Sequence, residues 1–325
     1  MFDLNISSQF TENKSPGLKE STLYDVIVIG GGPAGLNAAL YAKRKGLQTA
    51  IIVDKLGGQV LDTSSVENYL GFEEISGEGL TEKFRHHVTN LDIPIKKDSR
   101  VDRIEDGNIK KIHTSSGLVY QSKSVIIATG SKPRQLGVPG EEAYLGKGVA
   151  YCAICDGPFF TDLEVAVAGG GNSAVEAAID LSKIASKVKL IHRSDLKADQ
   201  ILIDRLNAIQ NIEVYTQTQI IELGGQALLE HVKVQDKSSG EEKIIQVNGI
   251  FVEIGYLPNS TAFEGLLERT PSGEIIVNDK TETNIPGIYA AGDVATVPYK
   301  QIIIAASEGA KAALSANDYV NKLKI

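Results

Sequence analysis

The chain has 325 residues and a formal net charge of −8, with 42% hydrophobic and 23% charged residues. This balance is typical of a soluble globular protein, and the length suits two domains. The acidic charge argues against a nucleic-acid partner, which would require a basic surface. No apolar run approaches the ~20 residues needed to cross a bilayer, so we expect no membrane partner and a cytoplasmic location.

The first 22 residues are rich in Ser, Asn, Lys and Glu, and they contain Pro16-Gly17. They lack the apolar stretch of a secretory signal. We therefore expect residues 1–22 to form a flexible N-terminal arm.

A β-α-β unit follows this arm. Residues Tyr24–Ile29 form an apolar, β-branched run without alternation, as in a strand that is buried on both faces of a parallel sheet. A glycine-rich turn comes next, then a helix-forming stretch around Ala38–Ala42 that ends at Gly46. The segment Thr49–Val53 is the second predicted strand.

The same pattern returns about 140 residues later, which indicates a second domain of the same type. Here the predicted strand is Glu164–Ala168, the helix is Ser173–Ser182 and the second strand is Val188–Ile191. Two further strand-to-turn segments, Val125–Gly130 and Gly287–Asp293, flank this repeat. They predict that the first domain is interrupted by the second.

The expected fold class is therefore α/β, with two three-layer Rossmann-like dinucleotide-binding domains, the second inserted into the first. We place the discontinuous first domain at residues 23–131 and 256–325. The second domain is expected at residues 132–255.

The first glycine-rich turn carries a dinucleotide-binding fingerprint, Gly30-Gly31-Gly32-Pro33-Ala34-Gly35. Gly30 allows the tight turn, Gly32 lets the backbone approach a pyrophosphate, and Gly35 lets the helix pack on the strand. Asp54 ends the second strand, where a carboxylate can accept hydrogen bonds from ribose hydroxyls. A structural glycine turn is the alternative, but strands, helix and acid together favour a dinucleotide.

The second fingerprint is Gly169-Gly170-Gly171-Asn172-Ser173-Ala174, with alanine in place of the last glycine. Its second strand ends in His192-Arg193 and carries no carboxylate there. A cation at this place can pair with a 2′-phosphate, which indicates a phosphorylated nucleotide.

The only cysteines of the chain, Cys152 and Cys155, form one C-x-x-C motif. Two thiols at this spacing can close a small-ring disulfide, and one thiolate can be stabilised by its neighbour. Zinc would need two more ligands, which neither a second cysteine pair nor suitably spaced histidines supply, so we expect no metal. Asp156 could donate a proton to this pair, or it could simply cap a helix or turn.

Together these motifs resemble the low-molecular-weight thioredoxin reductase family over the chain from Tyr24 onwards. Within it, the chain is most similar to the reductase portion of the flavoprotein subunits of alkyl hydroperoxide reductases. The residues that carry the resemblance are those of the motifs above, with Gly57-Gly58-Gln59, Val66-Glu67-Asn68-Tyr69, Ala128-Thr129-Gly130, Leu196–Gln200, Gly249–Val252, Gly292-Asp293-Val294 and Val297–Ala305.

The resemblance implies that FAD binds in the first domain and NAD(P)H in the second. In this family Asp54, Gln59 and Asn68 would hold ribose and flavin, Asp293 would contact the ribityl-phosphate region, and Gln301 and Ile302 would meet the flavin ring. The full set of expected FAD residues is Gly30, Gly32, Pro33, Ala34, Gly35, Asp54, Lys55, Gly58, Gln59, Asn68, Val101, Ala128, Thr129, Gly130, Gly292, Asp293, Lys300, Gln301 and Ile302. For NAD(P)H it is Gly171, Asn172, Ser173, Ala174, His192, Arg193 and Lys197.

The resemblance also implies a reaction: electrons pass from NAD(P)H through FAD to the Cys152–Cys155 disulfide, while the two domains rotate. Cys155 would be the thiol nearer the flavin, Cys152 would attack the disulfide of a partner, and Asp156 would assist proton transfer. The related flavoproteins carry an extra dithiol module in place of the short arm here. We therefore expect a separate thioredoxin or glutaredoxin-like protein as acceptor, and a homodimer.

Three points stay open at this level. The donor could be ferredoxin, as in relatives that have lost the second fingerprint, although that fingerprint is intact here. The chain could also be a non-catalytic flavin redox sensor. Finally, NADPH-specific relatives carry three arginines after the second strand, where this chain has only Arg193, Ser194 and Lys197; we expect a modest preference for NADPH, with NADH usable.

Overall fold

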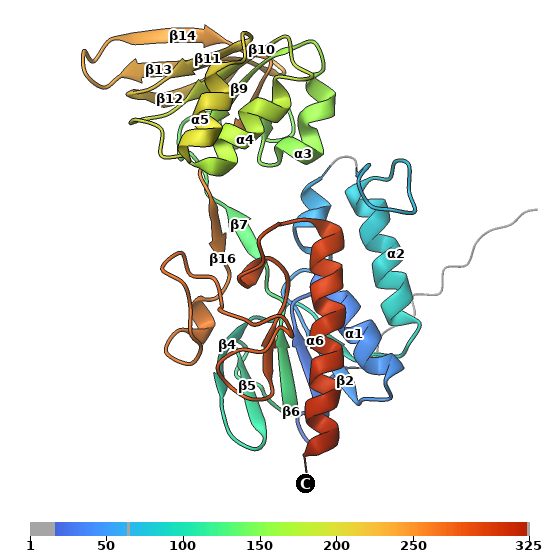
Figure 1. Cartoon of the computed structure of the whole chain (residues 1–325). Helices are drawn as coiled ribbons and strands as arrows, with labels where there is room; N and C mark the ends of the chain where they lie inside the picture. Colours follow the sequence, from blue (N-terminus) through green and yellow to red (C-terminus); the bar gives the residue numbers. More distant parts are fainter. Residues whose placement is uncertain (1–16, 64–65, 324–325) are drawn as a thin grey trace, which may run out of the picture. The chain divides into compact units, whose positions relative to one another are not determined.

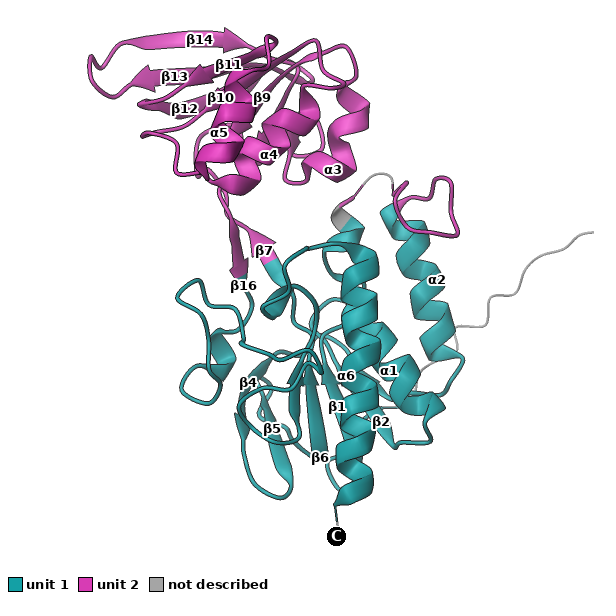
Figure 2. Cartoon of the chain, in the orientation of Figure 1, with its two compact units in different colours: residues 1–62, 77–131, 258–325 teal, residues 63–76, 132–257 magenta. Residues whose placement is uncertain are grey.

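The computed structural model describes residues 17–63 and 66–323, and these form two compact units (Figure 2). Unit 1 comprises the described parts of Met1–Asp62, Gly77–Ser131 and Pro258–Ile325, and unit 2 comprises those of Thr63–Ser76 and Lys132–Leu257. Most of the expected N-terminal arm, residues 1–16, lies outside the described residues. From Gly17 on, this segment contacts unit 1: Leu18 packs against its core, and Glu20 accepts a hydrogen bond from the Val119 N–H.

Unit 1 is built on a seven-stranded sheet in the order β3-β2-β1-β6-β5-β4, with β17 also pairing with β6. β3, β2, β1, β6 and β17 pair in parallel, whereas β4, β5 and β6 form an antiparallel meander. The strands are β1 (Leu23–Ile29), β2 (Thr49–Ile52), β3 (Ile95–Lys96), β4 (Val101–Glu105), β5 (Lys110–Thr114), β6 (Val119–Ile127) and β17 (Ile288–Ala290).

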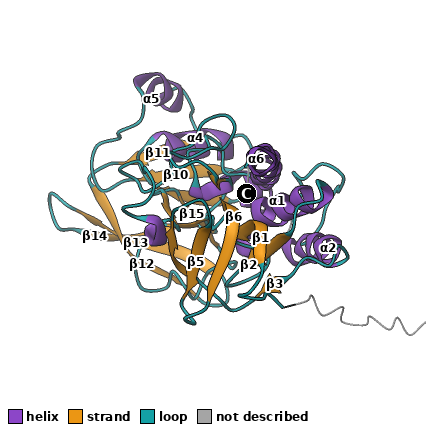
Figure 3. Ribbon diagram, turned by 90° about the horizontal axis from the view of Figure 1, so that it is seen from below, coloured by secondary structure: helices purple, strands orange, loops and turns teal. Residues whose placement is uncertain are grey.

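Three helices of unit 1 lie along one face of this sheet (Figures 1 and 3): α1 (Pro33–Arg44), α2 (Gly77–Thr89) and α6 (Ile302–Lys322). Single 3₁₀ turns occur at Gly58–Asp62, Thr261–Phe263 and Gly292–Val294. α6 runs directly against α1, and the contact depends on a glycine, because a Cβ at Gly309 would lie 2.0 Å from the Ala34 carbonyl oxygen. Alanines at 38, 39, 312, 313 and 316 complete the helix interface in the core.

Unit 2 contains a fully parallel sheet in the order β11-β10-β9-β15-β8, and an antiparallel sheet of β12, β13 and β14. The strands are β8 (Val149–Ala150), β9 (Glu164–Ala168), β10 (Lys187–Ile191), β11 (Ile212–Tyr215), β12 (Thr218–Gly225), β13 (Leu229–Asp236), β14 (Glu242–Gln246) and β15 (Gly249–Val252). The helices are α3 (Ala153–Asp156), α4 (Asn172–Leu181) and α5 (Gln200–Asn207), with a 3₁₀ turn at Gly157–Phe160.

The chain passes from one unit to the other through β7 (Ser131–Pro133) and returns through β16 (Tyr256–Pro258). These two short strands pair with each other in a two-stranded sheet. None of the helices in the described part of the chain is both long and apolar enough to span a membrane.

Both β-α-β units predicted from the sequence are present, as β1-α1-β2 and β9-α4-β10. The buried strands lie within one residue of their predicted bounds, because continuous β-branched runs mark strands that are covered on both faces. The antiparallel strands β12–β14 and the 21-residue helix α6 were not predicted. Their sequences are of mixed polarity, and their places are set by packing partners far away in the chain.

Replacing Gly309 by alanine tests the α1–α6 contact. Helix propensity alone would favour alanine by about 1 kcal/mol. The added methyl must instead displace α6 from α1, and such overpacking costs about 1–3 kcal/mol. We expect a lower urea midpoint by circular dichroism for Gly309→Ala, whereas Ser307→Ala on the exposed face of the same helix should leave it nearly unchanged. A midpoint for Gly309→Ala at or above the wild-type value would contradict this packing.

Candidate nucleotide and dithiol sites

The first glycine-rich turn of unit 1 fits tightly between two strands. Gly30 has φ +119°, and a Cβ there would lie 2.1 Å from the carbonyl oxygen of Ala128 at the end of β6. A Cβ at Gly35 would lie 2.2 Å from the Gly30 carbonyl oxygen. α1 begins at its N-cap Gly32 without a side-chain hydrogen bond among the described residues. Its first-turn N–H groups therefore suit a phosphate, and the turn fits a dinucleotide.

Three segments distant in sequence meet around this turn. A Cβ at Gly292 would lie 2.9 Å from the Cβ of Ala34, and a Cβ at Gly58 would lie 3.2 Å from the Cα of Gly32. The Gly292 turn, the Gly58 turn and the start of α1 thus form one cluster in unit 1. Gln59 lies beside it, and its amide donates a 2.6 Å hydrogen bond to the carbonyl of Ser131.

The segment Ala128-Thr129-Gly130 is held by a residue that the sequence did not indicate. The side-chain amide of Asn259 donates to the Thr129 carbonyl at 3.0 Å, and the Thr129 hydroxyl donates to the Asn259 carbonyl at 2.8 Å. The Asn259 N–H also donates to the Gly130 carbonyl. Because the two segments are 130 residues apart, Asn259 fixes the end of β6 through tertiary contacts.

Asp293 and Lys300 have different roles. Burial raises the pKa of Asp293, and the nearby Lys300 ammonium lowers it again in part. The Lys300 amino group donates to a carboxylate oxygen of Glu274 at 2.9 Å and to the carbonyls of Asp293 and Ala295. Lys300 is thus engaged with the chain itself and positions the turn that carries Asp293.

The remaining residues expected to bind FAD are spread over several elements. Asp54 forms an ion pair with Arg100, with 2.7 Å between Oδ2 and Nε. Lys55 follows it in the chain, and Val101 is the first residue of β4. Gln301 is the N-cap of α6 and Ile302 its first residue. Asn68, in contrast, belongs to the Thr63–Ser76 segment that is grouped with unit 2.

The second glycine-rich turn repeats the geometry of the first within unit 2. Gly169 has φ +150°, and a Cβ there would lie 2.3 Å from the carbonyl oxygen of Glu253 after β15. Gly171 caps α4 without a side-chain hydrogen bond among the described residues, and a Cβ at Gly171 would meet nothing within 4 Å. This open helix start fits the phosphates of a second nucleotide. Ser173 is exposed there and Ala174 is buried.

Asn172, although part of this fingerprint, holds the neighbouring helix. Its amide donates to Asp199 Oδ2 at 2.9 Å, and its oxygen accepts from the Asp199 N–H at 2.9 Å. Asp199 is the N-cap of α5. Asn172 thereby ties the start of α5 to the start of α4.

The loop after β10 brings the expected cations to the second fingerprint. The Lys197 N–H donates to the Gly170 carbonyl at 2.7 Å, and a Cβ at Gly170 would collide with the His192 ring. The pKa of His192 is lowered by burial and by the charges of Arg193 and Lys197. The Arg193 and Lys197 side chains are exposed, so the loop presents positive charge beside the glycine-rich turn.

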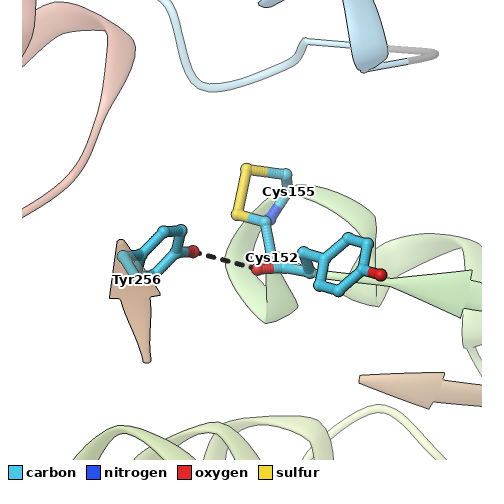
Figure 4. The surroundings of a disulfide bond; sticks show 4 residues. Cys152, Cys155 and Tyr256 are labelled. Atoms are coloured by element: carbon cyan, nitrogen blue, oxygen red, sulfur yellow. Dashed lines mark hydrogen bonds between the residues drawn. A yellow bond between two sulfur atoms is a disulfide. The ribbon is translucent and has the colours of Figure 1, made fainter. Parts of the chain in front are cut away.

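The cysteine pair lies at the start of the one-turn helix α3, which follows β8 (Figure 4). Cys152 and Cys155 form a disulfide with 5.3 Å between their Cα atoms. Cys152 is the N-cap of α3, and its Sγ accepts a hydrogen bond from the Cys155 N–H at 3.2 Å. After reduction the same N–H would stabilise a Cys152 thiolate.

The residue before the pair, Tyr151, is held at both ends. Its hydroxyl donates to Glu141 Oε1 at 2.9 Å, and its carbonyl accepts from the Tyr256 hydroxyl at 3.0 Å, the bond drawn in Figure 4. Glu141 is buried and also accepts hydrogen bonds from the N–H groups of Leu136 and Gly137. Burial and the Glu141 carboxylate raise the pKa of Tyr151, which keeps this phenol protonated.

Two carboxyl groups with raised pKa values lie at α3, namely Asp156, its last residue, and Glu253, which follows β15. Burial raises the pKa of Asp156 to about 6. Burial also raises the pKa of Glu253 to about 7, although a hydrogen bond from the Ala153 N–H opposes the rise. Carboxyl groups that titrate near neutral pH are suited to proton transfer.

Sequence reasoning missed Glu253, Tyr256, Glu141, Asn259 and Arg100. Glu253 could have been found from the sequence, because it is an acidic residue that directly follows the apolar segment Gly249–Val252. Tyr256, Asn259 and Arg100 act over long sequence separations, as with the 105 residues between Tyr256 and Tyr151, whereas Glu141 lies only 10 residues from Tyr151. In the described residues no group of three or more His, Cys, Asp and Glu side chains could hold a metal ion.

Comparisons with known proteins identify the family of the chain. The family model described as pyridine nucleotide-disulphide oxidoreductase matches residues 24–309. The F subunit of the alkyl hydroperoxide reductase of Escherichia coli (strain K12) is 44% identical over 313 residues, which are 94% of this chain and 60% of that protein. A protein named NADH dehydrogenase from Ferdinandcohnia aciditolerans is 44% identical over 304 residues, 93% of this chain and 59% of its own length.

Among solved structures, the crystal structure of thioredoxin reductase from Streptococcus pyogenes MGAS5005 is similar, with a TM-score of 0.86 and 39% identity. The similarity covers 93% of this chain and 99% of that one. By contrast, the chain spans about 60% of the length of the curated relatives above. The predicted α/β fold with two Rossmann-like domains is confirmed, and the chain belongs to the pyridine nucleotide-disulphide oxidoreductase family, close to the thioredoxin reductases and the F subunits of alkyl hydroperoxide reductases.

Proposed function

We propose that this chain is a flavin-dependent disulfide reductase that uses NAD(P)H to reduce the Cys152–Cys155 disulfide and, through it, the disulfide of a separate small redox protein. The arrangement of unit 2 is the main support. β8 leads into the cysteine pair, β9 leads into the second fingerprint, and β15 pairs with both in parallel. The dithiol and the nucleotide turn therefore emerge at the same edge of one sheet, where α/β proteins bind their ligands.

In this proposal FAD binds to unit 1. The N–H groups at the start of α1 would hold its pyrophosphate, and Asp54, Gln59, Asp293, Gln301 and Ile302 would contact the rest. A bound flavin would accept a hydride from NAD(P)H and pass the electron pair to the disulfide. Lys300 and Asn259 act indirectly, because they fix the two turns that carry Asp293 and Thr129.

Three residues of the chain carry out the second half of the reaction, in which the cysteine pair is reduced and in turn reduces the partner disulfide. Cys155 receives the electron pair, as the family resemblance implies, and Cys152 is released as the thiolate that attacks the partner disulfide. The Cys155 N–H stabilises that thiolate. The attack forms a mixed disulfide between Cys152 and the partner, the partner's second sulfur leaves as a thiolate, and Asp156, with its raised pKa, supplies the proton that this thiolate takes up. Cys155 then attacks the Cys152 sulfur, which re-forms the Cys152–Cys155 disulfide and releases the partner as a dithiol.

The acceptor that we propose is the disulfide of a thioredoxin or glutaredoxin-like protein. The name of the similar solved protein, thioredoxin reductase, gives a thioredoxin as the substrate of that protein. The similar F subunit is likewise named as one part of a larger reductase, which fits a chain that hands electrons to another protein. A cytoplasmic location and a homodimer remain predictions.

Two other functions fit these features less well. A ferredoxin-dependent reductase would not need the second fingerprint, whereas Gly169–Ala174 here forms an open helix start with a cationic loop beside it. A non-catalytic flavin sensor would not need a dithiol with a proton donor next to it. Both features favour an enzyme that uses a pyridine nucleotide.

We further propose that NADPH is preferred by a modest margin and that NADH is usable. Burial lowers the pKa of His192, and the charges of Arg193 and Lys197 lower it further, so these two cations lie close to the His192 ring beside the glycine-rich turn. A guanidinium can grip a phosphate with two parallel hydrogen bonds, while lysine offers a point charge. The carboxylate of Asp195, which accepts a hydrogen bond from Gln217 at 3.0 Å, lies in the same loop and acts against a phosphate, so the preference is modest. One similar protein is named NADH dehydrogenase, which keeps NADH a realistic donor.

The role of the cysteines is tested by single serine substitutions. In Cys155→Ser and in Cys152→Ser the rate of thioredoxin reduction should fall to the background rate, because neither variant can form the intramolecular disulfide. Anaerobic bleaching of the flavin by NADPH should stay at the wild-type rate in both, which serves as an internal control for folding and nucleotide binding. Full activity of either variant toward a protein disulfide would rule out the dithiol mechanism.

Asp156→Asn tests the proton donor. General acid catalysis contributes about 10²–10⁴-fold, so we expect a rate of partner reduction at pH 6 that is lower by about 10²-fold or more. Because the pKa of Asp156 is raised to about 6, its acid form declines as pH rises through 6, and the contribution of Asp156 should fade above that pH. The pH profile of single-turnover partner reduction measures this. Asp180→Asn, on the exposed side of α4, is the control, and an unchanged profile in Asp156→Asn would exclude the role.

Arg193→Ala tests whether Arg193 binds the 2′-phosphate of NADPH. A hydrogen bond to a charged group contributes about 1.5–3 kcal/mol, so the ratio of kcat/KM for NADPH over NADH should fall roughly tenfold or more. Arg205→Ala, an exposed arginine near the end of α5, is the matched control and should keep the wild-type ratio. A wild-type preference for NADH, or the same ratio in Arg193→Ala, would show that this loop does not select the phosphate.

A further inference from the structure

Glu253 occupies a junction within unit 2. It directly follows β15, which lies between β9 and β8 in the sheet. Its N–H donates to the Ala168 carbonyl at the end of β9, and its own carbonyl lies against Gly169 of the fingerprint. In the parallel register of β15 with β8, Phe251 lies opposite Ala150, so Glu253 comes opposite Cys152, and its carboxylate interacts with the Ala153 N–H of the turn that β8 leads into. One residue therefore contacts the nucleotide turn through its backbone and the dithiol turn through its side chain.

Packing does not explain a carboxylate at this position. The equivalent place in unit 1 is Ala128, whose N–H donates to the Ile29 carbonyl and whose carbonyl lies against Gly30. The backbone contacts of Ala128 and Glu253 thus correspond, and in unit 1 a methyl group completes them. The half-buried Glu253 side chain adds a charge that costs free energy to desolvate.

The dithiol turn shares its amide donors between two acceptors. The Cys155 N–H donates to Cys152 Sγ at 3.2 Å, while the Ala153 N–H interacts with the Glu253 carboxylate and lowers its pKa. The Ala153 N–H follows Cys152 directly in the chain, so the carboxylate lies beside the backbone of the cysteine that would become the thiolate. Two negative charges at the ends of neighbouring strands repel each other.

We propose that Glu253 is a positioning residue for the dithiol turn and that its carboxylate, when ionised, biases the Cys152–Cys155 pair toward the disulfide. This inference deepens the proposed function and rests on it. Reduction consumes two electrons and up to two protons: the sulfur–sulfur bond breaks and a thiol and a thiolate form. An ionised Glu253 opposes only the product that carries the thiolate, so it favours the oxidised pair and hastens transfer of electrons to an acceptor.

The charge on Glu253 changes in the physiological pH range, because burial raises its pKa to about 7 against the opposing Ala153 N–H. No charged side chain of the described residues contributes to this shift. The titratable groups on the neighbouring elements are the two thiols and Asp156 on α3 and His192 after β10, and Arg134 lies beside Gly255. A thiolate formed next to Glu253 raises the pKa of the carboxyl further, so reduction is accompanied by proton uptake there.

The test is the dithiol/disulfide equilibrium of the full chain, without nucleotide or partner. The protein is equilibrated in dithiothreitol redox buffers at pH 6 and pH 9, quenched with acid, and its free thiols are counted by alkylation and mass spectrometry. Glu253→Gln keeps an oxygen acceptor for the Ala153 N–H and removes the charge. At pH 9 we expect its reduced-to-oxidised ratio to exceed the wild-type ratio about tenfold, which is about 30 mV for a two-electron couple.

At pH 6 the two proteins should agree, because Glu253 is then protonated in the wild type. Glu230→Gln, an exposed glutamate on β13, should match the wild type at both pH values. Glu253→Ala should show the same rise at pH 9, which keeps the test available if the glutamine variant does not fold. Equal ratios at pH 9 would overturn the proposal, as would an equal difference at both pH values, which would reveal a purely structural effect. Failure of the proposed function would appear separately, as a flavin that NADPH does not bleach.

Discussion

The site geometry of both units depends on one close approach between backbones. In each unit the first glycine of the fingerprint lies close to a backbone carbonyl that follows the adjacent parallel strand. Gly30 contacts the carbonyl of Ala128, and Gly169 contacts that of Glu253. A Cβ would come within 2.1–2.3 Å of that oxygen, so no other residue type fits without moving the strand. The positive φ of these glycines turns the chain sharply and sets the axis of the helix that follows.

This constraint decides what can be placed around each turn. Because the helix start must stay open toward the ligand, neither α1 nor α4 has a capping side chain among the described residues. The chemistry is supplied by the residues that follow neighbouring strands at the same edge: Thr129 after β6, Cys152 after β8 and His192 after β10. The two units share a scaffold, and the side chains beyond these strand ends make one suited to a bound flavin and the other to a nucleotide and a dithiol.

The scaffold could be predicted from the sequence because its signals are local. A buried β-branched run, three glycines and an alanine-rich helix lie within about 25 residues, and steric limits on glycine tie the pattern to one geometry. The contacts that fix the site could not be predicted in this way. The contact of Arg100 with Asp54 joins segments 46 residues apart, and that of Asn259 with Thr129 joins segments 130 residues apart. An arginine or asparagine in a loop can have many roles, so neither residue type alone indicates such a contact.

The order of the strands in unit 2 also separates its charges. Going across the parallel sheet, β10 ends in the cationic loop of Arg193 and Lys197, β9 in the glycine turn, β15 in Glu253 and β8 in the cysteine pair. The positive charge therefore lies after β10, beside the glycine turn that would bind phosphate groups. The carboxyl groups with raised pKa values lie around α3, where protons must be exchanged. If these two charge sets were adjacent, each carboxyl would pair with a cation, which would lower its pKa and remove both proton exchange and the pH response near neutrality. The two strands between β10 and β8 thus keep phosphate binding and dithiol chemistry electrostatically apart on a single sheet.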